Sequence, residues 1–338
     1  MNSGRSKVGS VRKTAAIVLA AAFVVGLAGC SDLPRTVDSC TPAASGSASE
    51  SITATGKLGQ NPDAKVPTPT KTSKVQVSTI QQGTGAVLGT DDVAKVQYTI
   101  YAGATGEALG SSGQSGFTKA SEYQATVGAK ADPIGKTLEC ARVGSRTATV
   151  LTAQQFFGSA ATATSNGLSA KDVLVVVTDI ESGYRGRATG ALQPLQSGFP
   201  SIVTAPDGTP GVTFDLKLPP KTLEYEVIRG GSGATVKKGD SLLLQVEGIR
   251  WTTDPAPTDT FVSTWTAHKP VTTVAASVTQ NSKSTLDPGS AKALIGQKVG
   301  SQVLVVVPPK YGYPSGKAPQ GYPSGGTLVF IYDILGIQ

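Results

Sequence analysis

Short runs of apolar and β-branched residues, rich in Val, Ile, Thr and Tyr, recur between polar and glycine-containing segments from about residue 75 onward. Such short runs, bounded by the turn residues Gly, Pro and Asp, are typical of β-strands. A stretch rich in Gly and Pro, 190–211, separates the runs into two groups of four. The predicted strands are 74–80, 93–101, 146–152 and 172–180 in the first group, and 223–229, 241–249, 302–308 and 327–334 in the second.

The two groups carry the same pattern twice. Residues 82–101, QGTGAVLGTDDVAKVQYTIY, align with 230–249, GGSGATVKKGDSLLLQVEGI, and a later pair aligns around the shared sequence VGS. One short helix is predicted in each copy, at 133–141 and at 290–297. Strands far outnumber helices, so the repeat predicts two units of the same α+β fold, each about 110 residues long and large enough for one core.

The N-terminal segment has the form of an export signal. Four basic residues precede the apolar run 15–29, AAIVLAAAFVVGLAG, which is too short for a stable membrane span. It ends in LAGC, the pattern of a lipobox, so Cys30 is predicted to become the lipid-modified first residue of the mature chain. The alternative is an ordinary secretory signal followed by an incidental cysteine.

Composition divides the remainder of the chain. Ser, Thr, Ala, Gly and Pro dominate the segment after Cys30, which predicts a tether with at most one early strand. The predicted organisation is a signal peptide at 1–29, a tether at 30–74, a first domain at 75–183, an interdomain linker at 184–220 and a second domain at 221–338.

Charge and histidine content exclude several classes of function. Removing 1–29 takes away four positive charges and no negative ones, so the formal net charge falls from +7 to +3. The remaining basic residues are scattered along the chain. No nucleic-acid partner is therefore expected. The chain has one histidine, His268, and no Cys/His cluster, so no metal site and no cofactor are expected.

Two cysteines remain after Cys30. Because the chain is predicted to be exported to an oxidising space, Cys40 and Cys140 are expected to form a disulfide. Such a bond would close a loop of about 100 residues and tie the N-terminal segment to the first domain. The alternative is two unpaired, partly buried thiols.

The second copy resembles an FKBP-type peptidyl-prolyl isomerase. The similarity rests on KKGD, IGQKVGS, PPKYGY and TLVF, which occur in that order within about 223–336. The first copy resembles the same family more faintly, and tandem copies behind a lipobox are similar to exported lipoproteins of that family. The resemblance implies two FKBP-like domains, each a curved antiparallel sheet wrapped on one short helix.

The resemblance also implies a pocket for a proline ring. Rotation about an X–Pro bond is slow, taking about 10–100 s, and an apolar pocket that excludes water favours the twisted amide. Tyr313 falls on the family's ligand-binding tyrosine, and Tyr311 is expected to be a scaffold residue. The expected walls of the pocket are Phe261, Tyr313, Tyr322 and Phe330, although the two phenylalanines could equally be core residues of their strands.

Other pocket positions depart from the family pattern. Val246 replaces a tyrosine, Val262 an aspartate and Val271 an aromatic residue, and Ser290 stands where the floor tryptophan belongs. Leu286 or Leu294 could close the floor instead. Trp251 and Trp265 could also contribute, or each could equally be a surface or edge aromatic. In the first copy, Tyr98 and Ile134 keep their roles, but Leu109 replaces the first aromatic and Phe157 replaces the tyrosine at 313.

The sequence thus predicts a lipid-anchored, extracytoplasmic prolyl isomerase that assists exported polypeptides containing X–Pro bonds. One alternative is a non-catalytic module that binds Pro-containing or unfolded segments. A solute-binding transport lipoprotein fits the lipobox, but it does not explain the repeat of two small β-rich units.

Overall fold

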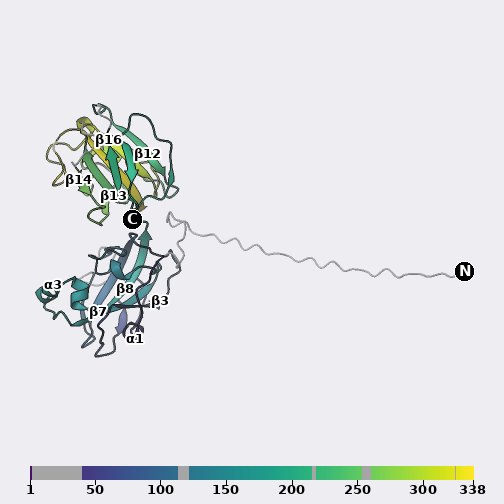
Figure 1. Ribbon diagram of the computed structural model, residues 1–338, viewed down its shortest axis with the longest axis vertical. Coiled ribbons are helices and arrows are strands. Elements are labelled where there is room, and N and C mark those ends of the chain that lie inside the picture. Colours follow the sequence, from purple (N-terminus) through teal and green to yellow (C-terminus); the bar gives the residue numbers. More distant parts are fainter. Residues whose placement is uncertain (2–39, 113–121, 215–217, 253–259, 324) are drawn as a thin grey trace.

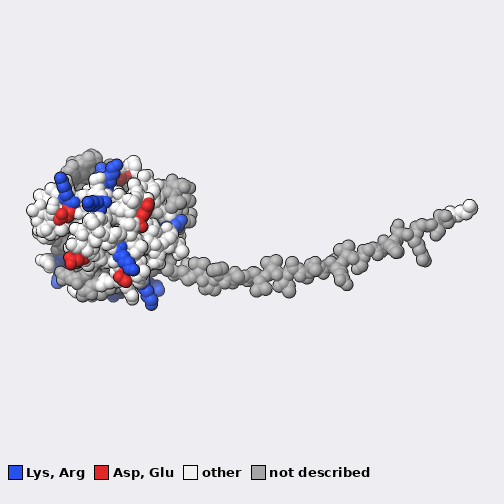
Figure 2. All heavy atoms as spheres, turned by 90° about the horizontal axis from the view of Figure 1, so that it is seen from below, with Lys and Arg blue, Asp and Glu red and all other residues white. Residues whose placement is uncertain are grey.

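The computed structural model describes residue 1 and residues 40–112, 122–214, 218–252, 260–323 and 325–338. Cys30 and the apolar run 15–29 lie outside the described residues. Two β-rich units follow one another along the chain, the first coloured purple to teal in Figure 1 and the second green to yellow. Basic and acidic residues are interspersed on the face drawn in Figure 2.

The first unit is built on a six-stranded antiparallel sheet. Its strands are ordered β3-β7-β8-β4-β5, and β6 also pairs with β4. Val, Ile and Thr dominate the central strands, which suits their burial on both faces. The strands are β3 (Gln76–Gln81), β4 (Val93–Ala102), β5 (Ala108–Ser111), β6 (Tyr123–Thr126), β7 (Arg146–Thr152) and β8 (Val173–Tyr184).

The second unit repeats this sheet. Its order is β14-β13-β17-β16-β12-β9, with β15 pairing with β13, so each strand of the first sheet has a counterpart here and β9 is added at one edge. The predicted α+β class and the internal repeat are confirmed. The strands are β9 (Ala191–Leu192), β12 (Glu224–Gly230), β13 (Ser241–Arg250), β14 (Thr260–Ser263), β15 (Val271–Val274), β16 (Gln302–Val307) and β17 (Leu328–Ile337).

The helix of the second unit forms where it is predicted. Helix α4 (Pro288–Leu294) begins after Asp287, whose side chain accepts a hydrogen bond from the Ser290 N–H, and Pro288 occupies the first turn. The helix packs against β16 and buries Leu294 completely in the core. A 3-10 turn, η4 (Pro309–Tyr311), follows β16.

The corresponding helix of the first unit is reduced to a 3-10 turn, η3 (Gly135–Thr137). Gly135 lies so close to β6 that a Cβ atom there would come within 2.0 Å of the Thr126 carbonyl oxygen, and Cys140 adopts a left-handed φ of 66°. The backbone therefore cannot continue as a regular helix. Two short helices form instead after β7, α2 (Ala153–Phe157) and α3 (Ala160–Ser165).

The predicted tether is wrong for residues 40–74, which are folded onto the first unit. This segment contains α1 (Ser47–Glu50) and a hairpin of β1 (Thr53–Thr55) and β2 (Asp63–Lys65). Ile52 is buried on the outer face of the sheet against side chains that include Val150 and Val177. Burial of these scattered apolar side chains, rather than local composition, decides the fold of the segment.

The prediction that 184–220 is an interdomain linker is also wrong, because much of this segment is folded. After β8 the chain forms β9 and a second hairpin, β10 (Ser201–Thr204) and β11 (Pro210–Thr213). Phe214, Ile202 and Val212 cover the outer face of the second sheet in the same way. Each repeat therefore includes an N-terminal hairpin, and its boundaries lie earlier than the sequence predicted.

A cross-strand polar pair anchors each hairpin segment. In the first unit Arg146 on β7 forms a fully buried salt bridge with Asp179 on β8, with Nε and Oδ1 2.6 Å apart. The same guanidinium donates to the carbonyl oxygens of Thr55, Gly56 and Lys57. The Arg146 guanidinium thus fixes the turn after β1 to the sheet, and the turn in return helps to bury the guanidinium.

The second unit has Gln302 and Asp333 at the matching register. Gln302 donates to Asp333 Oδ1 at 2.8 Å, and the other oxygen of Asp333 accepts the Ala188 N–H at 2.7 Å. A neutral amide therefore takes the place of the arginine. Each aspartate also accepts a backbone N–H from the segment that precedes its sheet, Gly59 in the first unit and Ala188 in the second.

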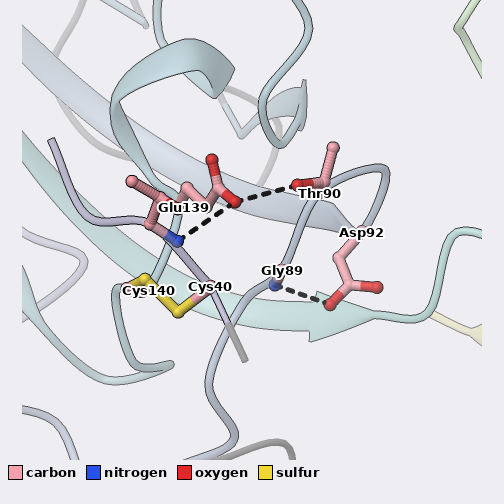
Figure 3. Close-up of a disulfide and its surroundings, with 7 residues drawn as sticks. Cys40, Gly89, Thr90, Asp92, Glu139 and Cys140 are labelled. Atoms are coloured by element: carbon pink, nitrogen blue, oxygen red, sulfur yellow. Dashed lines mark hydrogen bonds between the residues drawn. A yellow bond between two sulfur atoms is a disulfide. The ribbon is translucent and has the colours of Figure 1, made fainter. Parts of the chain in front are cut away.

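Cys40 and Cys140 form a disulfide, with their Cα atoms 5.6 Å apart (Figure 3). Glu139, next to the bond, accepts hydrogen bonds from the Thr90 hydroxyl at 2.9 Å and from the Thr41 N–H at 3.5 Å. The start of the described N-terminal segment is thereby joined to the loop between η3 and β7.

The two units also contact each other. Val93 of the first unit packs with Leu243 and Leu335 of the second, against the side chain of Tyr184. Across the same junction Thr126 Oγ1 donates to the His268 carbonyl oxygen at 2.8 Å. The junction thus combines buried apolar contacts with a direct hydrogen bond.

Candidate functional site

Four aromatic side chains of the second unit gather in one cluster. The Phe261 ring lies edge-on to Phe330, with centroids 5.6 Å apart, and 4.9 Å from the Tyr322 ring. Tyr313 meets Tyr322 edge-on at 5.5 Å. The structure thus brings together all four residues that the sequence assigned to the pocket walls, from β14, β17 and the connection between β16 and β17.

A glycine on β13 makes room for the Phe261 ring. Gly248 on β13 stands opposite Phe330 on β17, and a Cβ atom at position 248 would lie 2.8 Å from Phe261 Cε2 and 2.5 Å from Val262 Cγ1. Such distances are too short for any side chain. The absence of a Cβ therefore lets the Phe261 ring lie across the β13 backbone.

The two tyrosines of PPKYGYPSG have different surroundings. The Tyr313 hydroxyl donates to the Thr285 carbonyl oxygen at 2.7 Å, while Tyr311 packs against the core below Lys310. Burial, with the nearby Asp287 and Tyr322, raises the pKa of Tyr313 well above its ordinary value. Its hydroxyl therefore remains a neutral donor.

The weaker pocket residues belong to the same core cluster. Val246 and Leu286 are buried, while Val262 and Val271 are half-buried against the cluster. The two tryptophans lie elsewhere, so of the two alternatives the structure favours the one in which they are not part of the pocket. Trp251 packs on Phe214 on the outer face of the sheet, and Trp265 lies against Gly208.

Ser290 is fully buried and joins a polar network that the sequence did not predict. Its Oγ donates to Asp287 Oδ2 at 2.6 Å and accepts from the Tyr332 hydroxyl at 3.1 Å. Asp287 is recognisable in LDPGS as an aspartate before a helix-starting proline. Tyr332 has no such local signal, because its partner is 42 residues away.

Burial raises the pKa of the Asp287 carboxyl to about 6, against the opposing effect of the hydrogen bonds from Ser290. Tyr322, close to the same carboxyl, has its pKa raised to about 12, mainly by burial. The cluster therefore presents hydroxyl donors on an apolar floor. Within the described residues no group of His, Cys, Asp and Glu side chains is placed to hold a metal ion.

The equivalent region of the first unit differs. Tyr98 packs edge-on against Tyr123 at 5.7 Å, and Ile134 and Phe157 join the same core. Leu109, in the position of Phe261, is 49% exposed and contributes no wall. This unit therefore lacks both the first aromatic ring and the hydroxyl of Tyr313.

The fold and the cluster define a class of small α+β domain, in which a sheet and one short helix enclose an aromatic site with hydroxyl donors. Residues 233–335 match the profile of the FKBP-type peptidyl-prolyl cis-trans isomerase family. The matched residues lie within the second unit and include all four rings of the cluster. No curated protein sequence matches the chain.

Solved structures of the same kind are similar to the chain. They include FkpA from Escherichia coli, at 22% identity over 42% of this chain and 53% of that one, with a TM-score of 0.29. The three FKBP domains of wheat FKBP73 match at 15% identity over 78% and 94%, with a TM-score of 0.30. The chain spans about half the length of the FkpA structure.

Proposed function

We propose that the second unit is a peptidyl-prolyl cis-trans isomerase that binds proline rings against Phe261, Tyr313, Tyr322 and Phe330. The observation that carries the proposal is the contact of these four rings within the segment that matches the family. The barrier to rotation about an X–Pro bond is about 18–20 kcal/mol because resonance stiffens the C–N bond. A water-poor aromatic site favours the twisted amide over the planar one, and a neutral hydroxyl can hold its carbonyl oxygen.

The proposed substrates are exported polypeptides with X–Pro bonds. The predicted signal at 1–29 and the predicted lipid on Cys30 support a location at the outer face of the membrane. The disulfide between Cys40 and Cys140 is in keeping with an oxidising compartment. Among the described residues, no helix has the length and apolar character needed to cross a membrane.

The test is proline-limited refolding of an unrelated protein in the presence of the full chain. We expect the slow phase to be accelerated in proportion to the concentration of the wild-type chain, and Tyr313→Ala to remove most of the acceleration. An unaccelerated slow phase would exclude the isomerase. A truncated form of the protein should begin at residue 184, because β9 to β11 cover the second sheet.

A non-catalytic binding module is the second candidate. The Tyr313 hydroxyl already donates to the Thr285 carbonyl, so it must exchange partners before it can bind a substrate carbonyl. Such a module would bind Pro-containing segments without accelerating refolding. Titration of a blocked tetrapeptide, Ala-Leu-Pro-Phe, alongside the refolding assay separates the two candidates.

A further inference from the structure

At position 290 the helix of the second unit carries a small side chain, which contacts Tyr332 next to the aromatic cluster. Ser290 lies in the first turn of α4, has no exposed surface and carries no ring. The space beside it is nonetheless filled, because interiors of proteins are close-packed. The side chain that reaches Ser290 is Tyr332, which enters from β17 and is 3% exposed.

The Tyr332 ring continues the aromatic cluster. It stacks on Phe330 with centroids 5.5 Å apart and planes at 23°, and Phe330 in turn meets Phe261 edge-on. Its cross-strand partner is Val246 on β13, a small residue that leaves room for a tyrosine. Tyr332 thus lies directly behind the rings of the site.

Hydrogen bonds hold the ring in one orientation. The Tyr332 hydroxyl donates to Ser290 Oγ, which donates to Asp287 Oδ2, while Asp287 Oδ1 accepts the Ser290 N–H at 2.8 Å. Burial, with Tyr313 and Asp287 nearby, raises the pKa of Tyr332, so the hydroxyl keeps its proton. A ring fixed at both ends is preorganised as a rigid surface.

We propose that Tyr332 forms the floor of the proline-binding site, in the space left open by Ser290, and sets which side chains fit there. The inference rests on the proposed function, because it concerns the same site. The floor is supplied by the sheet rather than by the helix. Ser290 and Asp287 are positioning residues that act through Tyr332.

A double-mutant cycle on the full chain tests the floor. The variants are Tyr332→Val, Ser290→Trp and the two combined, and the probe is blocked Ala-Leu-Pro-Phe. We expect Tyr332→Val to weaken peptide binding by about tenfold or more, since a ring-sized contact area is lost. Ser290→Trp alone overfills the space and lowers the unfolding temperature, whereas the combined variant recovers both binding and stability because the ring returns from the helix.

Two further variants separate the ring from its hydroxyl. Tyr332→Phe keeps the ring and is expected to weaken binding by only about two- to threefold, through loss of one hydrogen bond. Tyr225→Val, an exposed position on β12, is the matched control and should leave binding unchanged. Intermolecular NOEs between proline ring protons and the Tyr332 ring are expected in the wild-type complex, and a purely structural role would not produce them.

The outcomes are distinguishable. Peptide binding that perturbs Phe261 and Tyr313, with no NOE to Tyr332 and no loss in Tyr332→Val, overturns the floor and leaves the proposed function standing. Absence of both peptide binding and accelerated refolding in the wild-type chain overturns the two together. Binding that fails in Tyr332→Val and returns in the combined variant supports the floor.

Discussion

The Tyr313 hydroxyl donates a hydrogen bond to the Thr285 carbonyl oxygen, at 2.7 Å, and so links the loop after β16 to the segment before α4. In the absence of substrate this contact satisfies the donor and fixes the ring beside Tyr322. A substrate carbonyl in the site would compete with Thr285 for the same proton. If the second unit is the proposed isomerase, its rate would depend on how easily that exchange occurs.

We expect Tyr313→Phe to lower kcat/KM for isomerisation by about three- to tenfold, because one hydrogen bond to the twisted amide is lost. The measurement is the protease-coupled assay with a proline tetrapeptide. Tyr311→Phe removes the neighbouring hydroxyl and is the control, with unchanged kcat/KM expected. Equal rates for Tyr313→Phe and the wild type would mean that the hydroxyl is not used.

Gly248→Ala should displace the Phe261 ring, since the added Cβ meets both Phe261 and Val262 at less than 3.0 Å. Overpacking of this kind costs about 1–3 kcal/mol of unfolding free energy, and we expect peptide affinity to fall as well. Urea denaturation and peptide titration measure the two effects. Gly110→Ala on β5 is the control, because its Cβ would meet no atom within 4 Å.

Arg146→Ala should release the turn after β1 from the first sheet. Removing one partner of a buried ion pair leaves Asp179 uncompensated, at a cost of roughly 3–5 kcal/mol. Arg146→Gln should cost less, because glutamine serves the same aspartate position in the second unit. Hydrogen exchange at residues 55–59 reports the release, and unchanged protection in Arg146→Ala would contradict the anchoring role.

Asp287→Asn should change how stability depends on pH. Because burial raises the pKa of Asp287 to about 6, the folded state binds its proton more tightly than the unfolded state. Its favourable contribution is complete below about pH 4 and is lost as pH rises through about 6. The unfolding free energy of Asp287→Asn relative to the wild type should therefore increase over this interval, as chemical denaturation would measure, and a constant difference would contradict the shift.

Much of the second unit could be predicted from local sequence. Runs of apolar and β-branched residues predicted β13, β16 and β17, and the helix predicted at 290–297 overlaps α4, because strand and helix signals act over a few residues. The four rings that cluster in the structure were singled out in the sequence through the motifs of the resemblance. The repeat was visible because both units carry the same turns in the same order.

The hairpin segments could not be predicted in the same way. Residues 40–74 and 184–214 contain few apolar side chains, and their composition is typical of a tether. They fold because Ile52 and Phe214 reach the outer faces of sheets whose strands come from distant parts of the chain. The sequence showed that these segments lack a core of their own, and the sheet supplied one.

By itself, the sequence determined two β-rich repeats, their predicted export signal and the residue types around the aromatic site, because periodicity, turns and motifs are local properties. Only the tertiary structure decided that Tyr332 stands against Ser290, and that an aspartate in each unit binds the backbone of the segment preceding its sheet. The physical reason is strand register. Because β16 pairs with β17 and α4 packs on β16, side chains tens of residues apart in the sequence come together. Once buried, their polar groups form hydrogen bonds with one another.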